Sequence, residues 1–306
     1  MVKVGFVYDD VFLKHETPLG HAENSTRLIH LVDVLRASAV WDRLVHIRPR
    51  RATFEDVALV HTKEYIEKLK RFGTGHLDFD TYMSKDSLET ARYAAGAVME
   101  AVDRCKKGEI ERAFCAVRPP GHHAEAHRAM GFCIFNNVAV GARYAQTIGY
   151  GRIFIIDFDV HHGNGTQHIF EEDDSVFYFS THQYPHYPGT GRSSERGRAR
   201  GEGFTFNVLM DSGSDDGDYS PVYNQVLPRL VNDFAPDLLL VSAGYDIHVK
   251  DPLSGIRVTD EGIRSIVRGI LSSTVKPVIF SLEGGYNLAA LARGVKITVE
   301  EMLKEG

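Results

Sequence analysis

Cysteine is scarce in this chain of 306 residues, and the three cysteines, Cys105, Cys115 and Cys133, form no C-x-x-C pair. An odd number of scattered cysteines argues against the disulfide framework that supports small secreted domains. Residues 1–8 are typical of a strand and not of a charged and then apolar signal peptide. We therefore expect a protein of a reducing compartment and predict a cytoplasmic location.

Long apolar runs are also missing, because no stretch reaches the roughly 18 apolar residues that indicate a transmembrane helix. Basic residues are not in excess, since 41 acidic residues outnumber 35 lysines and arginines and give a formal net charge of −6. This balance offers no general attraction to nucleic acid or to an anionic membrane. We expect neither of them as a partner, while the oligomeric state, including a homo-oligomer, stays open.

Two common functional motifs are absent or incomplete. No G-x-S-x-G sequence occurs, which disfavours a serine hydrolase. The segment Gly163-Asn164-Gly165 resembles the start of a dinucleotide-binding loop, but the third glycine of that motif would fall at His168. No Walker-type lysine follows the glycines, so we do not expect nucleotide binding there.

Short apolar runs alternate with segments of helical periodicity along the chain. This alternation predicts an α/β fold in which helices cover both faces of a parallel sheet. No repeat, low-complexity tract or linker interrupts it, so one domain over residues 1–306 is the simplest prediction. The predicted strands are residues 2–8, 45–47, 113–117, 153–156, 176–180, 205–209, 237–242 and 278–282. The predicted helices are residues 25–37, 64–72, 86–106, 138–147, 166–170, 219–234 and 260–272, with a last one that ends near residue 303. A capping box of Thr53 and Asp56 predicts one more short helix. Pro221 is expected in the first turn of its helix, and residues 73–85 are expected to be irregular.

Polar side chains follow four of the predicted strands directly. In open α/β sheets, ligands bind at the carboxyl ends of the strands, so we expect these side chains to meet. Two prolines and a glycine precede the two adjacent histidines and should hold them rigidly. The side chains in question are His122, His123, Asp157, Asp159, His161, Asp246 and Tyr286.

Asp159 and His161 are two residues apart and would point to the same side of an extended chain. A catalytic zinc usually has three protein ligands, and Asp246 would supply the third. Asp157 could be a further ligand or the acid that orients a histidine. The alternative is a set of capping and loop residues whose histidines merely satisfy their own hydrogen bonds.

These residues together indicate a metal-dependent hydrolase. The metal would polarise a carbonyl and activate a water molecule, a histidine would take the proton of that water, and Tyr286 could donate its hydroxyl to the oxyanion. Cys133 could be a nucleophile, but its apolar neighbours favour a buried structural thiol. Arg27 is either a surface cation or a buried guanidinium that binds an anion near the site.

Five motifs resemble those of the histone deacetylase and acetylpolyamine amidohydrolase family, and the class II deacetylase pattern is the nearest. The motifs are residues 118–124, 131–137, 157–166, 242–246 and 283–287, and the resemblance extends over nearly the full chain. It implies the arginase–deacetylase fold, a three-layer α/β/α structure with an eight-stranded parallel sheet. It also implies the zinc-dependent removal of acetyl or other acyl groups from acetyl-lysine or a similar acylated amine.

The resemblance assigns a role to individual residues. It implies one zinc ion on Asp159, His161 and Asp246. It implies His123 as general base and acid, with His122 paired to Asp157 beside it. Asn164 stands where class I enzymes have an acid behind the second histidine, and Tyr286 matches the tyrosine that binds the oxyanion.

Further positions match the substrate channel and the monovalent ion sites of the family. Phe132 and Tyr187 match aromatic channel walls, and Gly131 and Leu253 would border the same channel. Arg27 matches an arginine proposed to guide acetate in an internal cavity. One or two potassium ions are implied, and their positions would involve Asp157, Asp159, His161 and Ser180 for the first site, and Phe170 and Val176 for the second.

The sequence leaves the substrate open. Relatives that prefer polyamines carry a glutamate where this chain has Leu253, which favours acetyl-lysine, although Glu23, Glu125 or Asp251 could still serve a polyamine. The alternatives are an acetylpolyamine amidohydrolase and a zinc protein that holds acyl-lysine without turnover. The His-Pro-Glu sequence that is usual near the amino terminus of this family is His21-Ala22-Glu23 in this chain. The related arginases bind two manganese ions with extra carboxylates, and the matching positions here are Gly163 and His248. This difference argues for one metal ion.

Overall fold

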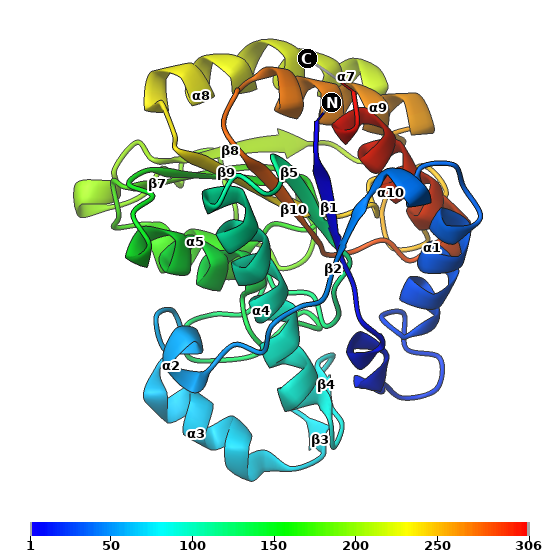
Figure 1. The fold of residues 1–306 in the computed structure, drawn as a ribbon. Coiled ribbons are helices and arrows are strands. Elements are labelled where there is room, and N and C mark those ends of the chain that lie inside the picture. The colour runs from blue at the N-terminus through cyan, green and yellow to red at the C-terminus, as the bar shows by residue number, and fades with distance from the viewer. Residues whose placement is uncertain (1, 305–306) are drawn as a thin grey trace.

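Eight strands form a single parallel sheet in residues 2–304, the range that the computed structural model describes (Figure 1). The predicted eight-stranded parallel sheet is thereby confirmed, whereas the predicted domain limits 1 and 306 lie outside the described residues. The order across the sheet is β2-β1-β5-β10-β9-β6-β7-β8. The bounds are β1 Val4–Val7, β2 Val45–Ile47, β5 Arg112–Cys115, β6 Ile153–Asp157, β7 Val176–Gln183, β8 Thr205–Met210, β9 Leu238–Ala243 and β10 Val278–Leu282.

Helices cover both faces of the sheet, as Figure 1 shows. On one face, α4 (Ser87–Lys106) and α5 (Asn137–Thr147) pack together. On the other face, α10 (Leu288–Met302) lies between α1 (Thr26–Arg36) and α9 (Asp260–Ser272). The remaining helices are α2 Phe54–Val57, α3 Lys63–Phe72, α6 Asn164–Phe170, α7 Asp216–Pro221 and α8 Leu227–Phe234. The result is the predicted three-layer α/β/α architecture.

The central strands are apolar because both of their faces are covered. Every residue of β6 and β9 is buried, and their alternate side chains pack against opposite helix layers. Strands β9 and β10 come late in the chain but lie between β5 and β6 in the sheet. The loops that follow β5, β6, β9 and β10 therefore meet at one edge, although they are far apart in the sequence.

Two local predictions were wrong. Residues 73–85, expected to be irregular, contain a short antiparallel ribbon of β3 (Gly75–His76) and β4 (Tyr82–Met83). Pro221 does not lie in a first helical turn, because α7 begins at Asp216 behind a capping box formed by Asp215 and Asp218. A π-helical segment, Val222–Val226, follows Pro221, whose missing N–H interrupts the regular α-helical ladder.

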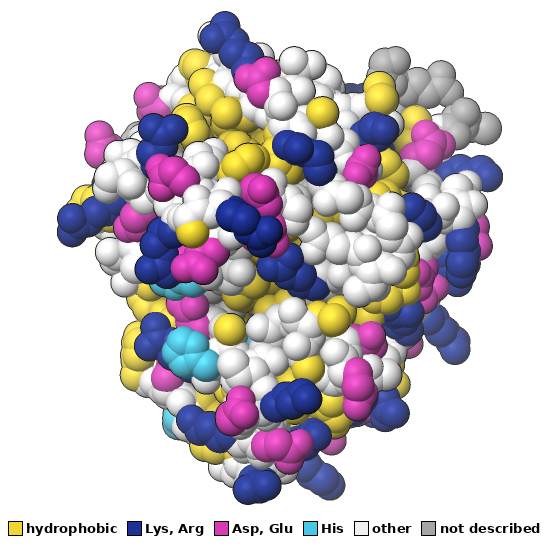
Figure 2. Space-filling view, turned by 90° about the vertical axis from the view of Figure 1, so that its left-hand side faces the viewer, with side chains coloured by type: hydrophobic (Ala, Val, Ile, Leu, Met, Phe, Trp, Pro, Cys, Tyr) yellow, Lys and Arg dark blue, Asp and Glu magenta, His cyan; other side chains and the backbone are white. Residues whose placement is uncertain are grey.

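The surface carries charges of both signs, and the cysteines are buried and unbridged in the described range. Lysines and arginines alternate with acidic side chains over the face shown in Figure 2, and hydrophobic side chains emerge between them in small groups. Cys105, Cys115 and Cys133 are all buried, and no disulfide joins them in the described range. Burial raises the pKa of the Cys133 thiol well above its ordinary value, so the thiol stays protonated. None of the helices in residues 2–304 has the length and apolar character needed to span a bilayer.

A buried ion cluster ties the amino-terminal loop to the end of β10. The Glu23 carboxylate accepts hydrogen bonds from Arg27 Nη1 at 3.0 Å and from Arg118 Nη2 at 2.8 Å. Arg27 also donates to the backbone carbonyls of Glu283 at 2.6 Å and Gly285 at 2.8 Å. Arg27 is only 1% exposed, so it is not a surface cation, and the anion that it binds is an internal carboxylate.

The substitution Glu23→Gln should leave two buried guanidinium groups without their charge partner. Loss of one member of a buried ion pair typically costs about 3–5 kcal/mol of unfolding free energy. Urea denaturation would measure this loss. Glu67→Gln, which removes an exposed partner of Lys70, is the matched control and should change the unfolding free energy little. Equal, small effects of both substitutions would show that the cluster does not stabilise the fold.

Candidate active site

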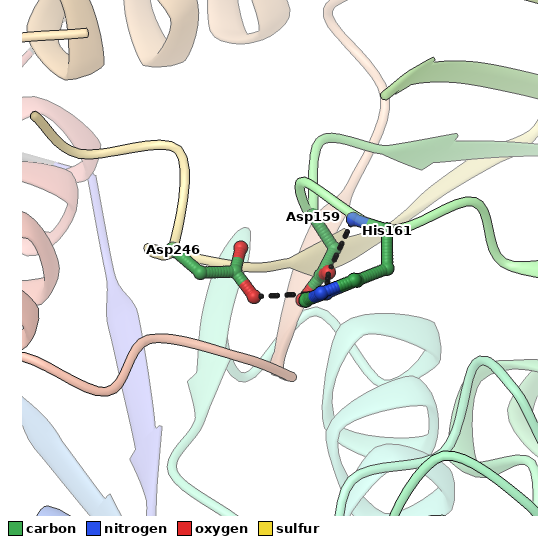
Figure 3. Close-up of side chains that lie close together, drawn as sticks. All are labelled: Asp159, His161 and Asp246. Atoms are coloured by element: carbon green, nitrogen blue, oxygen red, sulfur yellow. Dashed lines mark hydrogen bonds and ion pairs between the residues drawn. The ribbon is translucent and has the colours of Figure 1, made fainter. Parts of the chain in front are cut away.

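Three predicted metal ligands converge at the carboxyl edge of the sheet. Asp159 and His161 lie in the loop after β6, and Asp246 lies in the loop after β9. One potential ligand atom from each residue lies within 4.8 Å of the other two. The Nδ1 atom of His161 is 3.0 Å from Asp159 Oδ1 and 3.3 Å from Asp246 Oδ2, and Figure 3 shows the three side chains pointing toward one another.

Backbone amides hold the two carboxylates in this orientation. Val160 N donates to Asp246 Oδ1 at 2.9 Å, and Gly284 N donates to Asp159 Oδ2 at 2.8 Å. These bonds engage one oxygen of each acid and leave the other oxygen directed at His161. Gly284 has to be glycine, because a Cβ atom there would lie 2.0 Å from Asp246 Oδ2. The local backbone is therefore built around the cluster.

The charges of the cluster call for a cation. Burial raises the pKa of Asp246 to about 7, and the nearby charge of Asp159 adds to that effect. Burial alone would lower the pKa of His161, but its contacts with Asp159 and Asp246 outweigh this and raise it to about 10. Asp246 Oδ2 is buried and accepts no hydrogen bond of good geometry from the described residues, although His161 Nδ1 lies 3.3 Å away. An orphaned carboxylate oxygen beside an imidazole nitrogen and a second carboxylate fits a divalent metal such as zinc.

The two predicted histidines lie side by side next to this cluster, with ring centroids 4.0 Å apart. His122 Nδ1 is 3.0 Å from Asp157 Oδ2, and His123 Nδ1 donates to Asn164 Oδ1 at 2.8 Å. Burial would lower the pKa of His122, but the Asp157 and Asp159 charges raise it to about 10. Burial and the neighbouring histidines lower the pKa of His123 well below its ordinary value. These opposite pKa shifts favour the protonated form of His122 and the neutral form of His123.

A narrow cavity of about 90 Å³ leads down to these groups. The predicted channel residues Gly131, Phe132, Tyr187 and Leu253 all line it, and so does Tyr286. Phe132 and Tyr286 face each other edge to face, with centroids 6.0 Å apart. Phe132 has a φ of 67°, an uncommon value for a residue other than glycine that often marks a functional constraint.

Three acids make contacts around the site that were not predicted from the sequence, although Asp251 is a candidate partner for a polyamine and Glu283 belongs to one of the family motifs. Asp251 Oδ2 accepts from the backbone amide of Tyr286 at 2.7 Å, and Glu283 Oε2 accepts from that of Gly121 at 2.6 Å. Asp80 lines the cavity and accepts from Gly131 N at 3.1 Å. In the sequence, only the position of Asp251 and Glu283 near the family motifs indicates that they belong to the site. That position does not indicate which backbone amide each carboxylate binds.

The residues expected at the potassium sites are also close to the strand ends. Asp157 and Ser180 are paired across β6 and β7. Ser180 Oγ is bonded to His182 Nδ1 at 2.8 Å. Phe170 ends α6 and Val176 begins β7, so a short turn separates them. Their role in binding potassium stays a prediction.

The acids that could have met a polyamine are occupied by other contacts. Glu23 is fully buried between two arginines. Glu125 accepts from Asn164 Nδ2 and lies 2.8 Å from His168 Nδ1. The two oxygens of Asp251 accept from the backbone amides of Leu253 and Tyr286. Glu23 and Asp251 therefore present no free oxygen to a remote ammonium group. The contacts of Glu125 are all made by Oε1, and Glu125 does not line the cavity.

Comparisons with known proteins agree with the fold and the site. The Histone deacetylase domain model matches residues 21–302. The chain is 38% identical over 292 residues to a probable deacetylase of Archaeoglobus fulgidus, an alignment that covers 93% of this chain and 81% of that protein. It is 36% identical over 325 residues to histone deacetylase 5 of Arabidopsis thaliana, covering 99% of this chain but only 49% of the plant protein. The crystal structure of the HDA15 HD domain superposes with a TM-score of 0.94 at 35% identity, covering 98% of this chain and 91% of that one.

A three-layer α/β/α fold with polar side chains gathered at the ends of its central parallel strands is that of the arginase–deacetylase superfamily. Because the domain model matches most of the chain, the protein belongs to the histone deacetylase family, and its deacetylase-type hydrolase character follows from that membership. The predicted family resemblance is confirmed.

The substitution Asp246→Asn tests the metal cluster. Loss of an outer-shell partner alone typically costs roughly 10–100-fold in metal affinity, so loss of a ligand carboxylate should weaken zinc binding by more than that. Competition with a chromophoric chelator would measure the affinity. Asp211→Asn, at an exposed acid away from the cluster, should bind zinc like the parent protein. Unchanged affinity in Asp246→Asn would contradict the assignment.

Proposed function

We propose that this protein is a zinc-dependent amidohydrolase that removes acetyl or similar acyl groups from acetyl-lysine side chains. The observation that carries the proposal is the unpartnered oxygen of Asp246, which faces His161 and Asp159 beside a histidine pair that lines a narrow aromatic cavity. Asp159, His161 and Asp246 would hold one zinc ion. When bound, the metal would polarise the acyl carbonyl and lower the pKa of a water molecule.

His123 is suited to act as the general base and, later, the general acid. Its Nδ1–H is committed to Asn164 Oδ1, so the free lone pair is on Nε2. Because its pKa is lowered, His123 is neutral and can take a proton from the attacking water. The same nitrogen can then return the proton to the leaving amine, which departs as a neutral molecule.

His122 is suited to an electrostatic role. Its raised pKa keeps it protonated, and its proton on Nδ1 is bonded to Asp157. A fixed positive charge 4.0 Å from His123, measured between ring centroids, opposes a second protonation there until negative charge develops on the substrate. The pair therefore combines one permanent cation with one exchangeable proton.

Tyr286 is suited to bind the oxyanion. Burial raises the pKa of its hydroxyl well above its ordinary value, so the group remains a hydrogen-bond donor. Its backbone amide is bound by Asp251, and the preceding carbonyl, that of Gly285, is bound by Arg27. A donor that is fixed in advance stabilises developing charge without the cost of reorganisation.

The remaining assignments belong to the same proposal. Residues 1–306 would form one domain, and one or two potassium ions would stabilise the strand ends near Ser180 and between Phe170 and Val176. Arg27 would border an internal cavity for acetate, with its guanidinium already held by Glu23. The proposal includes no role for nucleic acid or membrane binding.

The lining of the cavity favours acetyl-lysine over an acetylated polyamine. The aromatic rings of Phe132 and Tyr187 suit an apolar lysine stem, and Leu253 offers no charge to a remote ammonium. Glu23, Glu125 and Asp251 are engaged elsewhere. The relatives are described as a probable deacetylase and as a histone deacetylase, which agrees with this choice.

Side-by-side kinetics on an acetyl-lysine peptide and on acetylputrescine would test the substrate. We expect kcat/KM to be higher for the peptide by roughly tenfold or more, about the effect of a single apolar contact. Leu253→Glu should shift the ratio toward acetylputrescine. A wild-type preference for acetylputrescine would support the acetylpolyamine alternative, and no turnover of either compound by zinc-loaded protein would support a binding protein.

The substitution Tyr286→Phe tests the oxyanion assignment. Loss of one oxyanion donor typically lowers kcat by roughly 100–1000-fold, while zinc content and inhibitor affinity should stay near normal. Tyr219→Phe is the matched control, because the Tyr219 hydroxyl is buried, has no hydrogen-bond partner in the described range and does not line the cavity. Near-normal turnover in Tyr286→Phe would remove Tyr286 from the mechanism.

A further inference from the structure

A chain of hydrogen bonds leads from His123, at the cavity, to the exposed side chain of His168. His123 Nδ1 donates to Asn164 Oδ1 at 2.8 Å, and Asn164 Nδ2 donates to Glu125 Oε1 at 2.6 Å. The same Glu125 oxygen lies 2.8 Å from Nδ1 of His168, whose side chain is 39% exposed. Glu125 itself is only 4% exposed, so its carboxylate is a buried link between the site and a solvent-exposed side chain.

The amide of Asn164 does not define its own orientation. Its oxygen and nitrogen have nearly the same size and could exchange places by a rotation of the amide group. An ionised carboxylate only accepts hydrogen bonds, so Glu125 requires the Nδ2 side of the amide. The Oδ1 side must then face His123, which in turn must carry its proton on Nδ1.

Local backbone packing keeps this alignment in place. Gly165, at the start of α6, lies so close to residue 124 that a Cβ atom would be 2.2 Å from the carbonyl oxygen of Ala124. Thr166 N also donates to the carbonyl of His122 at 3.2 Å. The segment that carries the two histidines and Glu125 is therefore fixed against the helix turn that carries Asn164.

The side chains of His168 and Arg128, which lie beside Glu125, favour the ionised form of its carboxylate. His168 Nδ1 is bonded to the carboxylate, and Arg128 Nη2 lies 4.0 Å from it. Burial would raise the pKa of Glu125, but His168, Asn164 and Arg128 lower it below its ordinary value. The carboxylate can therefore act as an acceptor only, which the orientation of Asn164 depends on.

We propose that Glu125 is a positioning residue: through the amide of Asn164 it keeps the proton of His123 on Nδ1 and the lone pair on Nε2. In this way a neutral asparagine performs the orienting task that an acid next to the base would otherwise perform. The proposal rests on the proposed function of His123 as the general base. Glu125 touches neither the substrate cavity nor the metal cluster, so its effect passes entirely through Asn164.

The isosteric substitution Glu125→Gln would test this role. A glutamine can present either oxygen or nitrogen, so the shortest contact that orients the Asn164 amide no longer requires its Nδ2 side. Only the longer contacts of Nδ2 with the His123 carbonyl and Met130 Sδ, both at 3.3 Å, then oppose a reversed amide, and His123 loses its single tautomer. We expect kcat for an acetyl-lysine peptide to fall roughly 10–100-fold, with KM nearly unchanged. Loss of a residue that orients a metal ligand usually has an effect of this size, and Glu125 would orient the general base in the same way. Glu171→Gln, at a neighbouring surface acid that binds Arg198, is the control and should not change kcat.

The decisive comparison is the effect of Glu125→Gln in the wild-type protein and in the Asn164→Asp variant. A carboxylate at position 164 accepts from His123 Nδ1 in either orientation, and it would face the Glu125 carboxylate across the present 2.6 Å contact. In this background Glu125→Gln removes a like-charge contact and should not lower kcat. Such loss of effect is the coupling expected of residues in one hydrogen-bond network. If Glu125→Gln lowers kcat equally in both backgrounds, the amide of Asn164 does not transmit its effect and the proposal is wrong.

The ¹⁵N chemical shifts of the His123 ring give a readout that does not depend on activity. Wild-type protein should show one tautomer with the proton on Nδ1, and Glu125→Gln should show a mixture. A single unchanged tautomer in Glu125→Gln would overturn the proposal even if kcat fell. If wild-type, zinc-loaded protein does not hydrolyse the peptide at all, the proposed function fails, while the ring shifts still decide the role of Glu125.

Discussion

The unpaired oxygen of Asp246 is the constraint on which the rest of the structure depends. Two buried carboxylates and one imidazole lie within 4.8 Å of one another, and a proton on His161 cannot satisfy both acids. Burying charge without a partner is costly, so this arrangement fits a divalent cation bound at its centre. Chain segments after β6 and β9 have to converge there, and the strand order β10-β9-β6 brings them together.

Three further acids surround the metal cluster and the histidine pair, and they hold neighbouring residues in position. Asp157 bonds His122, Asp251 bonds the Tyr286 amide, and Glu283 bonds the Gly121 amide. Each of these carboxylates is buried and engaged by donors from another loop. These bonds hold His122, Tyr286 and Gly121 in place without a substrate, which is the preorganisation that the proposed mechanism needs. The ion cluster at Glu23 extends this support to the amino-terminal segment through Arg27.

The sequence predicted much of this fold because the signals were local. Apolar runs bounded by polar residues placed the strands of the sheet, and spacing in Asp157-Phe158-Asp159-Val160-His161 directed attention to the cluster that the structure brings together. The contacts of Asp251 and Glu125 were not predictable, because each joins residues remote in sequence through a backbone amide or a side-chain amide. Pro221 was misplaced because the capping box of Asp215 and Asp218 starts the helix at Asp216, several residues earlier than the apolar pattern indicated.

Anomalous diffraction at the zinc absorption edge from crystals of the purified protein tests the central claim most directly. The account predicts one strong peak enclosed by Asp159, His161 and Asp246, at about 2.0–2.2 Å from one ligand atom of each residue. A protein that contains one equivalent of zinc but shows its peak elsewhere, with Asp246 Oδ2 bonded to another group, would contradict the account.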